Sequence, residues 1–306
     1  MANHTQPFFS VIVPTYNRAH LIGKTLDTVL GQTFQDFEIV IVDNKSTDNT
    51  VEVLKPYLAD QRITLYVQKE NYERSSSRNK GMELARGRYL TFLDSDDVLY
   101  KDSLKQAHQY ALATPGTNIF HHYYELADFS GNHVYSYTFP QIGTDMLKNL
   151  LLGNFLSCIG VFISPDVYKQ YKFDENKASL GSEDWDFWIR VVRDHQLGVI
   201  PKVCAAIIQH DERTVMQNRV PAILARKEYY MDKYRNTPGL FQKMGKYLHI
   251  FEAGFYLYTA TVSYQVANYS SGYRYLFRAF TKYPGSFFSK VFWRILLSPI
   301  KNTFKK

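Results

Sequence analysis

The sequence contains few cysteines and no long hydrophobic run, and both absences narrow the class of protein. Two cysteines occur in 306 residues, Cys158 and Cys204, which excludes a disulfide scaffold, and without a Cys-x-x-Cys pair they offer no zinc knuckle. No stretch reaches the roughly 18 apolar residues of a transmembrane helix. The opening Met-Ala-Asn-His-Thr-Gln-Pro has neither the basic nor the apolar region of a signal peptide. We therefore expect a cytoplasmic protein.

Glycine-rich phosphate loops are also absent. Neither G-x-x-x-x-G-K-[ST] nor G-x-G-x-x-G follows the first apolar run, which is the place where a nucleotide-binding glycine loop would stand. Carboxylates, a metal ion and aromatic stacking are then the means by which this chain could hold a nucleotide.

Acidic residues are scarce only at the end of the chain. The composition is that of a globular protein, with 45% hydrophobic and 21% charged residues and a net charge of +7. Residues 240–306 contain ten Lys or Arg, one acid and 18 aromatic residues, whereas residues 1–239 contain 26 basic and 28 acidic residues. Because the larger part is net acidic, nucleic acid is not an expected partner.

The first hundred residues alternate between short apolar runs and segments with helical spacing. Three strand–helix units followed by a fourth strand predict an α/β fold with a mostly parallel sheet flanked by helices. The expected strands are residues 8–13, 37–42, 63–67 and 89–93, and the expected helices are 21–30, 46–58 and 75–85.

The pattern changes in the later part of the chain, and this change predicts two domains. Strands are expected within 117–137 and at 159–163 and 203–208, and helices at 144–153 and 183–194. Beyond about residue 220 the pattern is helical throughout. We expect a catalytic domain at 1–220 and a helical, basic and aromatic extension at 221–306.

Three polar clusters follow three of the expected strands, and parallel strands place such clusters at one edge of the sheet, where ligands bind. The clusters begin at Thr15, Asp43 and Asp94. The last of them, Asp94-Ser95-Asp96-Asp97, crowds carboxylates that a hard divalent ion would hold together. The other interpretation is a loop that caps the next helix.

Five motifs in order resemble the family 2 glycosyltransferases of GT-A fold. They cover about residues 7–215 and read Val13-Pro14-Thr15-Tyr16-Asn17-Arg18, Val42-Asp43-Asn44-x-Ser46-x-Asp48, Arg78-Asn79-x-Gly81, Leu93-Asp94-Ser95-Asp96-Asp97 and Glu183-Asp184-Trp185-Asp186.

The resemblance implies inverting transfer of a sugar from a nucleoside diphosphate donor, with UDP the favoured nucleotide, to an acceptor hydroxyl. It assigns Asp184 as the general base, Glu183 and Trp185 to the acceptor, and Asp94, Asp96 and His210 to Mn²⁺ or Mg²⁺. The residues that it assigns to the donor are Pro14, Thr15, Tyr16, Asn17, Arg18, Asp43, Arg78, Asp94, Ser95 and Asp96.

The general chemistry of glycosyl transfer agrees with these roles. A divalent ion neutralises the departing diphosphate, and a carboxylate can take the proton of the attacking hydroxyl. Two departures stand out: Asn44-Lys45 replaces the family's common Asp-Gly, and Glu73 replaces a common Gly. A sugar-1-phosphate nucleotidyltransferase and a catalytically silent nucleotide-sugar-binding protein are the alternatives.

The basic, aromatic tail predicts contact with an anionic membrane surface at the inner face of the cytoplasmic membrane. Phe288, Phe292, Ile295 and Leu296 recur at helical spacing, with Lys290, Arg294 and Lys301 around them. The other interpretation is a terminal helix packed on its own domain or in a homo-oligomer. With a membrane contact, a lipid-linked or surface-polysaccharide glycan becomes the natural acceptor.

Overall fold

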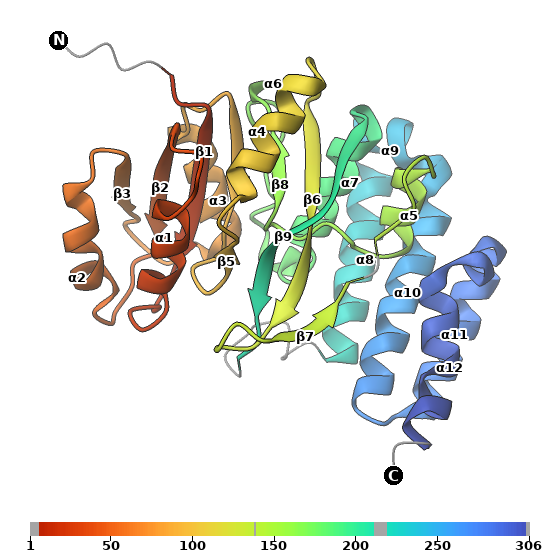
Figure 1. Cartoon of the computed structure of the whole chain (residues 1–306). Helices are drawn as coiled ribbons and strands as arrows, with labels where there is room; N and C mark the ends of the chain where they lie inside the picture. Colours follow the sequence, from red (N-terminus) through yellow and green to blue (C-terminus); the bar gives the residue numbers. More distant parts are fainter. Residues whose placement is uncertain (1–5, 138, 211–218, 304–306) are drawn as a thin grey trace. The chain divides into compact units, whose positions relative to one another are not determined.

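The computed structural model describes residues 6–137, 139–210 and 219–303 (Figure 1). The chain forms two compact units. The first, which we call the sheet unit, contains Met1–Ile142, Leu156–Glu175 and Glu183–Asp211. The second, which we call the helical unit, contains Gly143–Phe155, Asn176–Ser182 and Glu212–Lys306. Residues 304–306 of the expected extension lie outside the described part.

The sheet unit is built around one twisted sheet. Its strands run in the order β3-β2-β1-β4-β8-β6-β9-β5, and β7 pairs with β6. The strands are β1 (Phe9–Thr15), β2 (Phe37–Asp43), β3 (Ile63–Val67), β4 (Tyr89–Phe92), β5 (Val98–Leu99), β6 (Ile119–Ala127), β7 (His133–Ser136), β8 (Val161–Ile163) and β9 (Leu197–Ile208).

The α/β class predicted from the alternating pattern is confirmed. Strands β1, β2, β3 and β4 are mutually parallel where they pair, as the three strand–helix units require. The sheet becomes mixed beyond β4, because β8 pairs antiparallel with both β4 and β6. Strand β9 is longer than expected: it begins at Leu197, and its parallel pairing with β6 contains two register shifts.

Helices cover the sheet of this unit. They are α1 (Ile22–Leu30), α2 (Thr50–Leu54), the 3₁₀ turn η1 (Lys55–Ala59), α3 (Glu73–Leu84), α4 (Ser103–Ala113), α6 (Pro165–Tyr168) and α7 (Glu183–Asp194). Helix α7 has the predicted bounds, and α3 begins two residues earlier than predicted.

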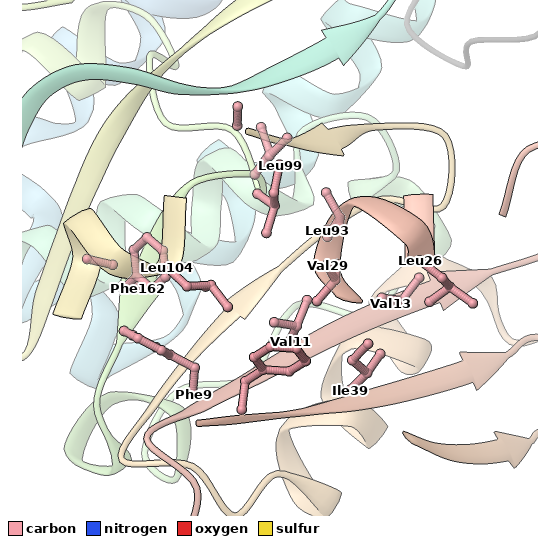
Figure 2. Packing of buried hydrophobic residues seen from close by; sticks show 14 of the residues in the cluster. Phe9, Val11, Val13, Leu26, Val29, Ile39, Leu93, Leu99, Leu104 and Phe162 are labelled. Carbon is pink, nitrogen blue, oxygen red and sulfur yellow. The ribbon is translucent and has the colours of Figure 1, made fainter. Parts of the chain in front are cut away.

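Strand β1 is buried on both faces and organises the core. Val11 and Val13 belong to the same apolar cluster as Leu26 and Val29 of α1 (Figure 2). Ile12 points to the other face, toward α3. A Cβ at Gly81 of α3 would lie 2.2 Å from Ile12 Cγ2, so only glycine permits this close helix–strand approach. That close approach sets the distance between α3 and β1.

The helical unit is a bundle centred on α10 (Leu248–Gln265), which contacts α5, α8, α11 and α12. Its other elements are α5 (Met146–Leu152), η2 (Lys177–Ser179), α8 (Val220–Asn236), α9 (Pro238–Met244), η4 (Gly245–Tyr247), α11 (Tyr269–Lys282), η5 (Pro284–Phe288) and α12 (Lys290–Thr303). Within residues 6–137, 139–210 and 219–303, no helix combines the length and apolarity that crossing a membrane requires.

The apolar stripe predicted at the C-terminus is divided differently from the prediction. Phe288 lies in η5 rather than on α12, because the helix begins only at Lys290. Phe292 and Ile295 are buried, so the stripe that was expected to face a membrane packs inside the helical unit. The exposed side chains are others, and they include Phe277, Phe288, Trp293 and Leu297.

Candidate active site

The first two polar clusters meet at the carboxyl ends of β1 and β2, as predicted from the parallel pairing. Thr15 and Asp43 are partners in the ladder, and Asn44 N donates to Thr15 O over 2.8 Å. The Thr15 side chain is buried, and its Oγ1 finds no hydrogen-bond partner within the described residues. A buried hydroxyl without a partner is costly in a folded chain, and a ligand can satisfy it.

Ser46 joins the two loops. Its hydroxyl donates to Asp43 Oδ1 over 2.5 Å and accepts from the backbone N–H of Asn17 over 2.9 Å. Asp43 Oδ2 accepts a further bond from Ser46 N over 2.9 Å. The Asp43 carboxylate is therefore held in a fixed orientation and keeps lone pairs for one more donor. Pro14 is buried beside it, whereas Tyr16 is exposed.

The third cluster forms a tight turn directly after β4. Asp97 N donates to Asp94 O, and the buried Asp97 carboxylate accepts from Ile208 N at the end of β9 over 3.0 Å. Asp97 therefore has a structural task, and Ser95 is buried beside it. Asp94 and Asp96 are left facing outward, with side chains that are 37% and 17% exposed.

Asp96 meets His210, the histidine that follows β9. His210 Nε2 lies 2.9 Å from Asp96 Oδ2, and Arg18 Nε lies 3.6 Å from the same oxygen. A carboxylate and an imidazole are suitable ligands for Mn²⁺. No group of three His, Cys, Asp or Glu side chains within the described ranges forms a complete metal site. An ion held here would therefore need oxygen ligands from water or from a bound diphosphate.

Arg78 of α3 connects the third cluster to α7. Its Nη2 donates to Asp94 Oδ1 over 2.9 Å, and its Nη1 donates to Glu183 Oε1 over 3.2 Å. The Arg78 and Glu183 side chains are each only 3% exposed. Arg74 Nε, 3.3 Å from Glu183 Oε1, adds a second cation at the rim. Glu183 thus has a structural ion-pair role in addition to the acceptor contact predicted for it.

Asp184 lies beside this ion-pair network and is partly exposed. Its Oδ1 accepts from Trp185 N over 2.8 Å. Burial, and then the negative charge of Glu183, raise the pKa of Asp184 to about 6. A carboxylate with a raised pKa is a better proton acceptor near neutral pH than an ordinary aspartate. Trp185 is buried, so most of its indole contacts protein rather than solvent.

Cys158 is a member of this region that the sequence did not reveal. It precedes Ile159, which forms an isolated bridge with Phe92, and this bridge brings it to the end of β4. Burial raises the pKa of the Cys158 thiol well above its usual range; the charge of Arg78 opposes this, and the charges of Asp184 and the other carboxylates add to it. The thiol therefore stays neutral and fills space beneath the carboxylates.

Both departures from the family pattern have left-handed backbone. Lys45 has φ of 61° and Glu73 has φ of 76°, values that favour glycine. The loop that contains Lys45 contacts the loop that precedes Glu73. Asn44 Nδ2 donates to Asn71 Oδ1 over 2.7 Å, and Asn44 Oδ1 accepts from Tyr72 N over 3.0 Å. The chain thus keeps the glycine-type backbone at two positions where it has placed charged side chains.

Replacing Glu73 with glycine is expected to stabilise the protein by about 0.5–1 kcal/mol. Removing the left-handed strain gains roughly 1–2 kcal/mol, and losing a charge near the N-terminus of α3 costs less than about 1 kcal/mol. Chemical denaturation measures the difference. Glu73→Ala is the matched control, since it removes the charge and keeps the strain, and it is expected to be no more stable than the wild type. Equal stability of the Gly and Ala variants would contradict the argument.

Comparison with known proteins gives the site its context. The family model described as glycosyl transferase family 2 matches residues 10–166, which is half of the chain. An uncharacterized glycosyltransferase of Haemophilus influenzae is 28% identical over 63% of this chain and 75% of its own length. TuaG of Bacillus subtilis, a glycosyltransferase provisionally assigned to teichuronic acid biosynthesis, is 33% identical over 59% of this chain and 71% of its own. The match to a longer relative from Rickettsia bellii spans 30% of that protein.

Solved structures show the same fold. The 1–349 fragment of Staphylococcus aureus TarS, in complex with UDP-GlcNAc, has a TM-score of 0.64 and 19% identity over 90% of this chain and 81% of its own. A mannosyltransferase of Pyrobaculum calidifontis, in complex with GDP-Man and Mn²⁺, has a TM-score of 0.56 and 17% identity over 99% of this chain and 89% of its own. These likenesses confirm the predicted GT-A fold.

The family match covers the first four motifs and the strands from β1 to β8, and it ends before α7, where Glu183 and Asp184 stand. The family model matches half of the chain, and relatives named as glycosyltransferases match about 60% of it. Together they establish the family that the fold and the five motifs indicated. This chain belongs to glycosyl transferase family 2 and is a glycosyltransferase.

Proposed function

We propose that this enzyme transfers a sugar with inversion from a nucleoside diphosphate donor, a UDP-sugar, to the hydroxyl of a glycan acceptor. The observation that carries the proposal is the position of Asp184, a partly exposed carboxylate of raised pKa beside the Arg78–Asp94–Glu183 network. One carboxylate base and one leaving-group site are what a single displacement requires.

The base and nucleotide ends of the donor fit the loops after β1 and β2. The buried Thr15 hydroxyl, the oriented Asp43 carboxylate and the exposed Tyr16 ring offer two hydrogen-bonding groups and a stacking surface. The hydrogen bonds that orient the Asp43 carboxylate come from Ser46, which is uncharged. An N–H donor of a base is therefore a suitable partner for the remaining lone pairs of the carboxylate. TarS binds UDP-GlcNAc with the same fold, which supports a uracil nucleotide here.

The diphosphate end of the donor fits the third cluster. Asp96 and His210, with Asp94 beside them, are the residues that would hold Mn²⁺ or Mg²⁺, and the Mn²⁺ complex of the Pyrobaculum relative supports this choice. When bound, such an ion would neutralise the charge of the departing diphosphate. Arg18 lies next to Asp96 and can add its positive charge on the same side.

Asp184 performs the proton transfer in this proposal. The acceptor hydroxyl attacks the anomeric carbon, its oxygen forms the new glycosidic bond, and its proton passes to the Asp184 carboxylate as the bond to the diphosphate breaks. The hydrogen bond from Trp185 N to Asp184 Oδ1 orients the carboxylate that receives the proton. Arg78 acts as a positioning residue, because its guanidinium pairs with both Asp94 and Glu183 and so holds the two carboxylates in place.

Metal-dependent nucleotide binding tests the donor site. Calorimetric titration of UDP, GDP and dTDP, each with Mn²⁺ and with EDTA, is expected to show one preferred nucleotide whose affinity falls at least about tenfold without the metal. Asp96→Ala should reduce wild-type binding to the EDTA level. Asp102→Ala, on a half-buried residue before α4, is the control and should bind as the wild type does. Equal affinity with Mn²⁺ and EDTA would contradict the metal assignment.

We further propose that the acceptor is presented at an anionic membrane surface. In the helical unit, Phe277 is 66% and Phe288 is 85% exposed, and Arg274 and Lys290 are exposed near them in sequence. Large aromatic rings that insert below the headgroups and cations that contact them are the elements of interfacial binding. Such a surface suits a lipid-linked glycan, and TuaG's provisional assignment to a cell-surface polymer agrees with this.

Vesicle co-sedimentation tests this surface. Binding to vesicles with about 30% phosphatidylglycerol is expected, and Phe277→Ser with Phe288→Ser should weaken it at least about tenfold, because each buried phenyl ring contributes roughly 1.5–3 kcal/mol. Phe241→Ser, at an exposed phenylalanine of α9, is the matched control. Equal binding to pure phosphatidylcholine, or no loss in the double variant, would contradict the proposal.

A further inference from the structure

Phe129 stands beside the proposed metal ligands, at a position that no motif includes. Strands β6 and β9 run parallel with Ala127 opposite Ile208, and Gln209 N donates to Ala127 O over 2.8 Å. Two residues farther along, the chain places Phe129 next to His210, with ring centroids 5.8 Å apart and an interplanar angle of 50°. The strand pairing therefore carries an aromatic ring to the side of the Asp96–His210 pair.

The turn that carries Phe129 is well held. Asp128 N donates to Asn132 O over 3.0 Å, and Asn132 N donates to Asp128 Oδ1 over 2.8 Å. Gly131 has φ of 83°, the left-handed conformation that lets the turn close. Lys24 Nζ of α1 donates to the carbonyl of Phe129 itself over 2.6 Å. The backbone that carries the ring is thus held by contacts within the turn and by Lys24 of α1.

The ring itself is not used by the core. Phe129 is 47% exposed and lies outside the apolar clusters of the sheet unit. Isolated exposed aromatics are common on protein surfaces and need no explanation. This one differs in its location, because it adjoins a histidine that contacts Asp96 over 2.9 Å, and the turn beneath it is anchored.

We propose that Phe129 is a stacking platform for a pyranose ring at the reaction centre. The C–H face of a hexopyranose is apolar and flat, and it packs on an aromatic ring, while its hydroxyls remain free for polar neighbours. The inference rests on the proposed function, since it concerns a sugar that lies next to the diphosphate site. The sugar belongs either to the donor or to the acceptor, and either can present an apolar C–H face to the ring.

Binding measurements with Phe129→Ala separate these sources. The probes are UDP and GDP, their glucose, mannose and N-acetylglucosamine esters, and the octyl glycosides of the same three sugars, all titrated in the presence of Mn²⁺. Phe129→Ala is expected to bind the free nucleotides as the wild type does and to lose at least tenfold in affinity for a sugar ligand. Loss for a sugar nucleotide assigns the platform to the donor, and loss for a glycoside assigns it to the acceptor.

Two further variants distinguish stacking from a loosened hairpin. Phe129→Tyr keeps an aromatic face and should retain wild-type affinity for the sugar ligand. Tyr135→Ala removes another exposed ring from the same hairpin, on β7, and should leave the affinity unchanged. The proposal is overturned if Phe129→Ala binds every sugar probe as the wild type does, if it loses free nucleotide equally, or if the wild type binds no sugar probe beyond the free nucleotide. Failure of the wild type to bind any nucleotide would instead overturn the proposed function.

Discussion

Replacing Asp184 with asparagine is expected to lower the rate of sugar transfer by about 10²–10⁴-fold, the usual contribution of a general base, and to leave nucleotide affinity within about twofold. Asparagine can still accept the hydrogen bond from Trp185 N, so the start of α7 should be preserved. It cannot take the proton of the attacking hydroxyl. Initial rates of nucleotide release with saturating donor and acceptor measure the loss.

The raised pKa of Asp184 predicts how the rate depends on pH. Burial and the charge of Glu183 bring that pKa to about 6, so the base is protonated and inactive below this value. The rate should fall about tenfold per pH unit below about pH 6 and level off above it. Glu183→Gln removes the neighbouring negative charge and should shift the inflection to lower pH. An inflection that does not move would contradict the assigned cause.

Stability serves as the control for folding. Because the folded state raises the pKa of Asp184, its carboxyl favours folding below the unfolded pKa of about 4, and that contribution is lost as the pH rises through about 6. At pH 7 a neutral asparagine should therefore be at least as stable as the aspartate. Asp194→Asn, at the other end of α7, is the matched exchange and should leave the rate unchanged. A rate near that of the wild type for Asp184→Asn would exclude Asp184 as the base.

The hydrophobic pattern of the sequence predicted those strands and helices whose conformation follows from their own residues rather than from distant pairing. Strands β1 and β2 are short, mainly apolar runs, and α7 has an acidic first turn followed by apolar residues at helical spacing, so their places could be predicted directly. The first six residues of β9 were missed. Pro201 and two exposed neighbours interrupt the pattern there, and pairing with β6 maintains the strand across two register shifts.

Those residues of the candidate site that lie at the carboxyl ends of parallel strands could be predicted from the sequence. The rule that parallel strands end at one edge brought Thr15 and Asp43 together in advance, and the ladder confirms their pairing. The pairing of Arg78 with Glu183 was not predictable, because it joins α3 to α7 across 105 residues. Cys158 and Phe129 carry no motif, and only the bridge to β4 and the β6–β9 register bring them near the site.

Amphipathic spacing identified an apolar face at the C-terminus but not its partner. Phe292 and Ile295 recur as an interfacial helix requires, yet they are buried in the helical unit. The same periodicity serves a helix packed on protein and a helix lying on lipid, and only three-dimensional burial distinguishes them. Phe288, in the 3₁₀ turn before α12, is the residue that burial leaves outside.

Arg78→Met is expected to destabilise the protein by about 3 kcal/mol, the usual cost of removing one partner of a buried ion pair. The substitution roughly keeps the volume of the side chain and removes the buried ion-pair partner of Glu183, which is 3% exposed, while the rim contact from Arg74 remains. For a chain of this size the midpoint of thermal unfolding should fall by roughly 6–12 °C. Differential scanning calorimetry measures it.

Neutralising the abandoned carboxylate should restore part of this stability. Arg78→Met combined with Glu183→Gln removes both charges, so the double variant is expected to be more stable than Arg78→Met alone by about 1–2 kcal/mol. Arg62→Met is the matched control, since the Arg62–Asp60 pair is about one-third exposed and should contribute less than about 1 kcal/mol. Equal losses for Arg62→Met and Arg78→Met would show that the buried network adds nothing beyond a surface ion pair. A double variant less stable than Arg78→Met would show that the charge on Glu183 is held by groups other than Arg78, and that Arg78 acts on Asp94 alone.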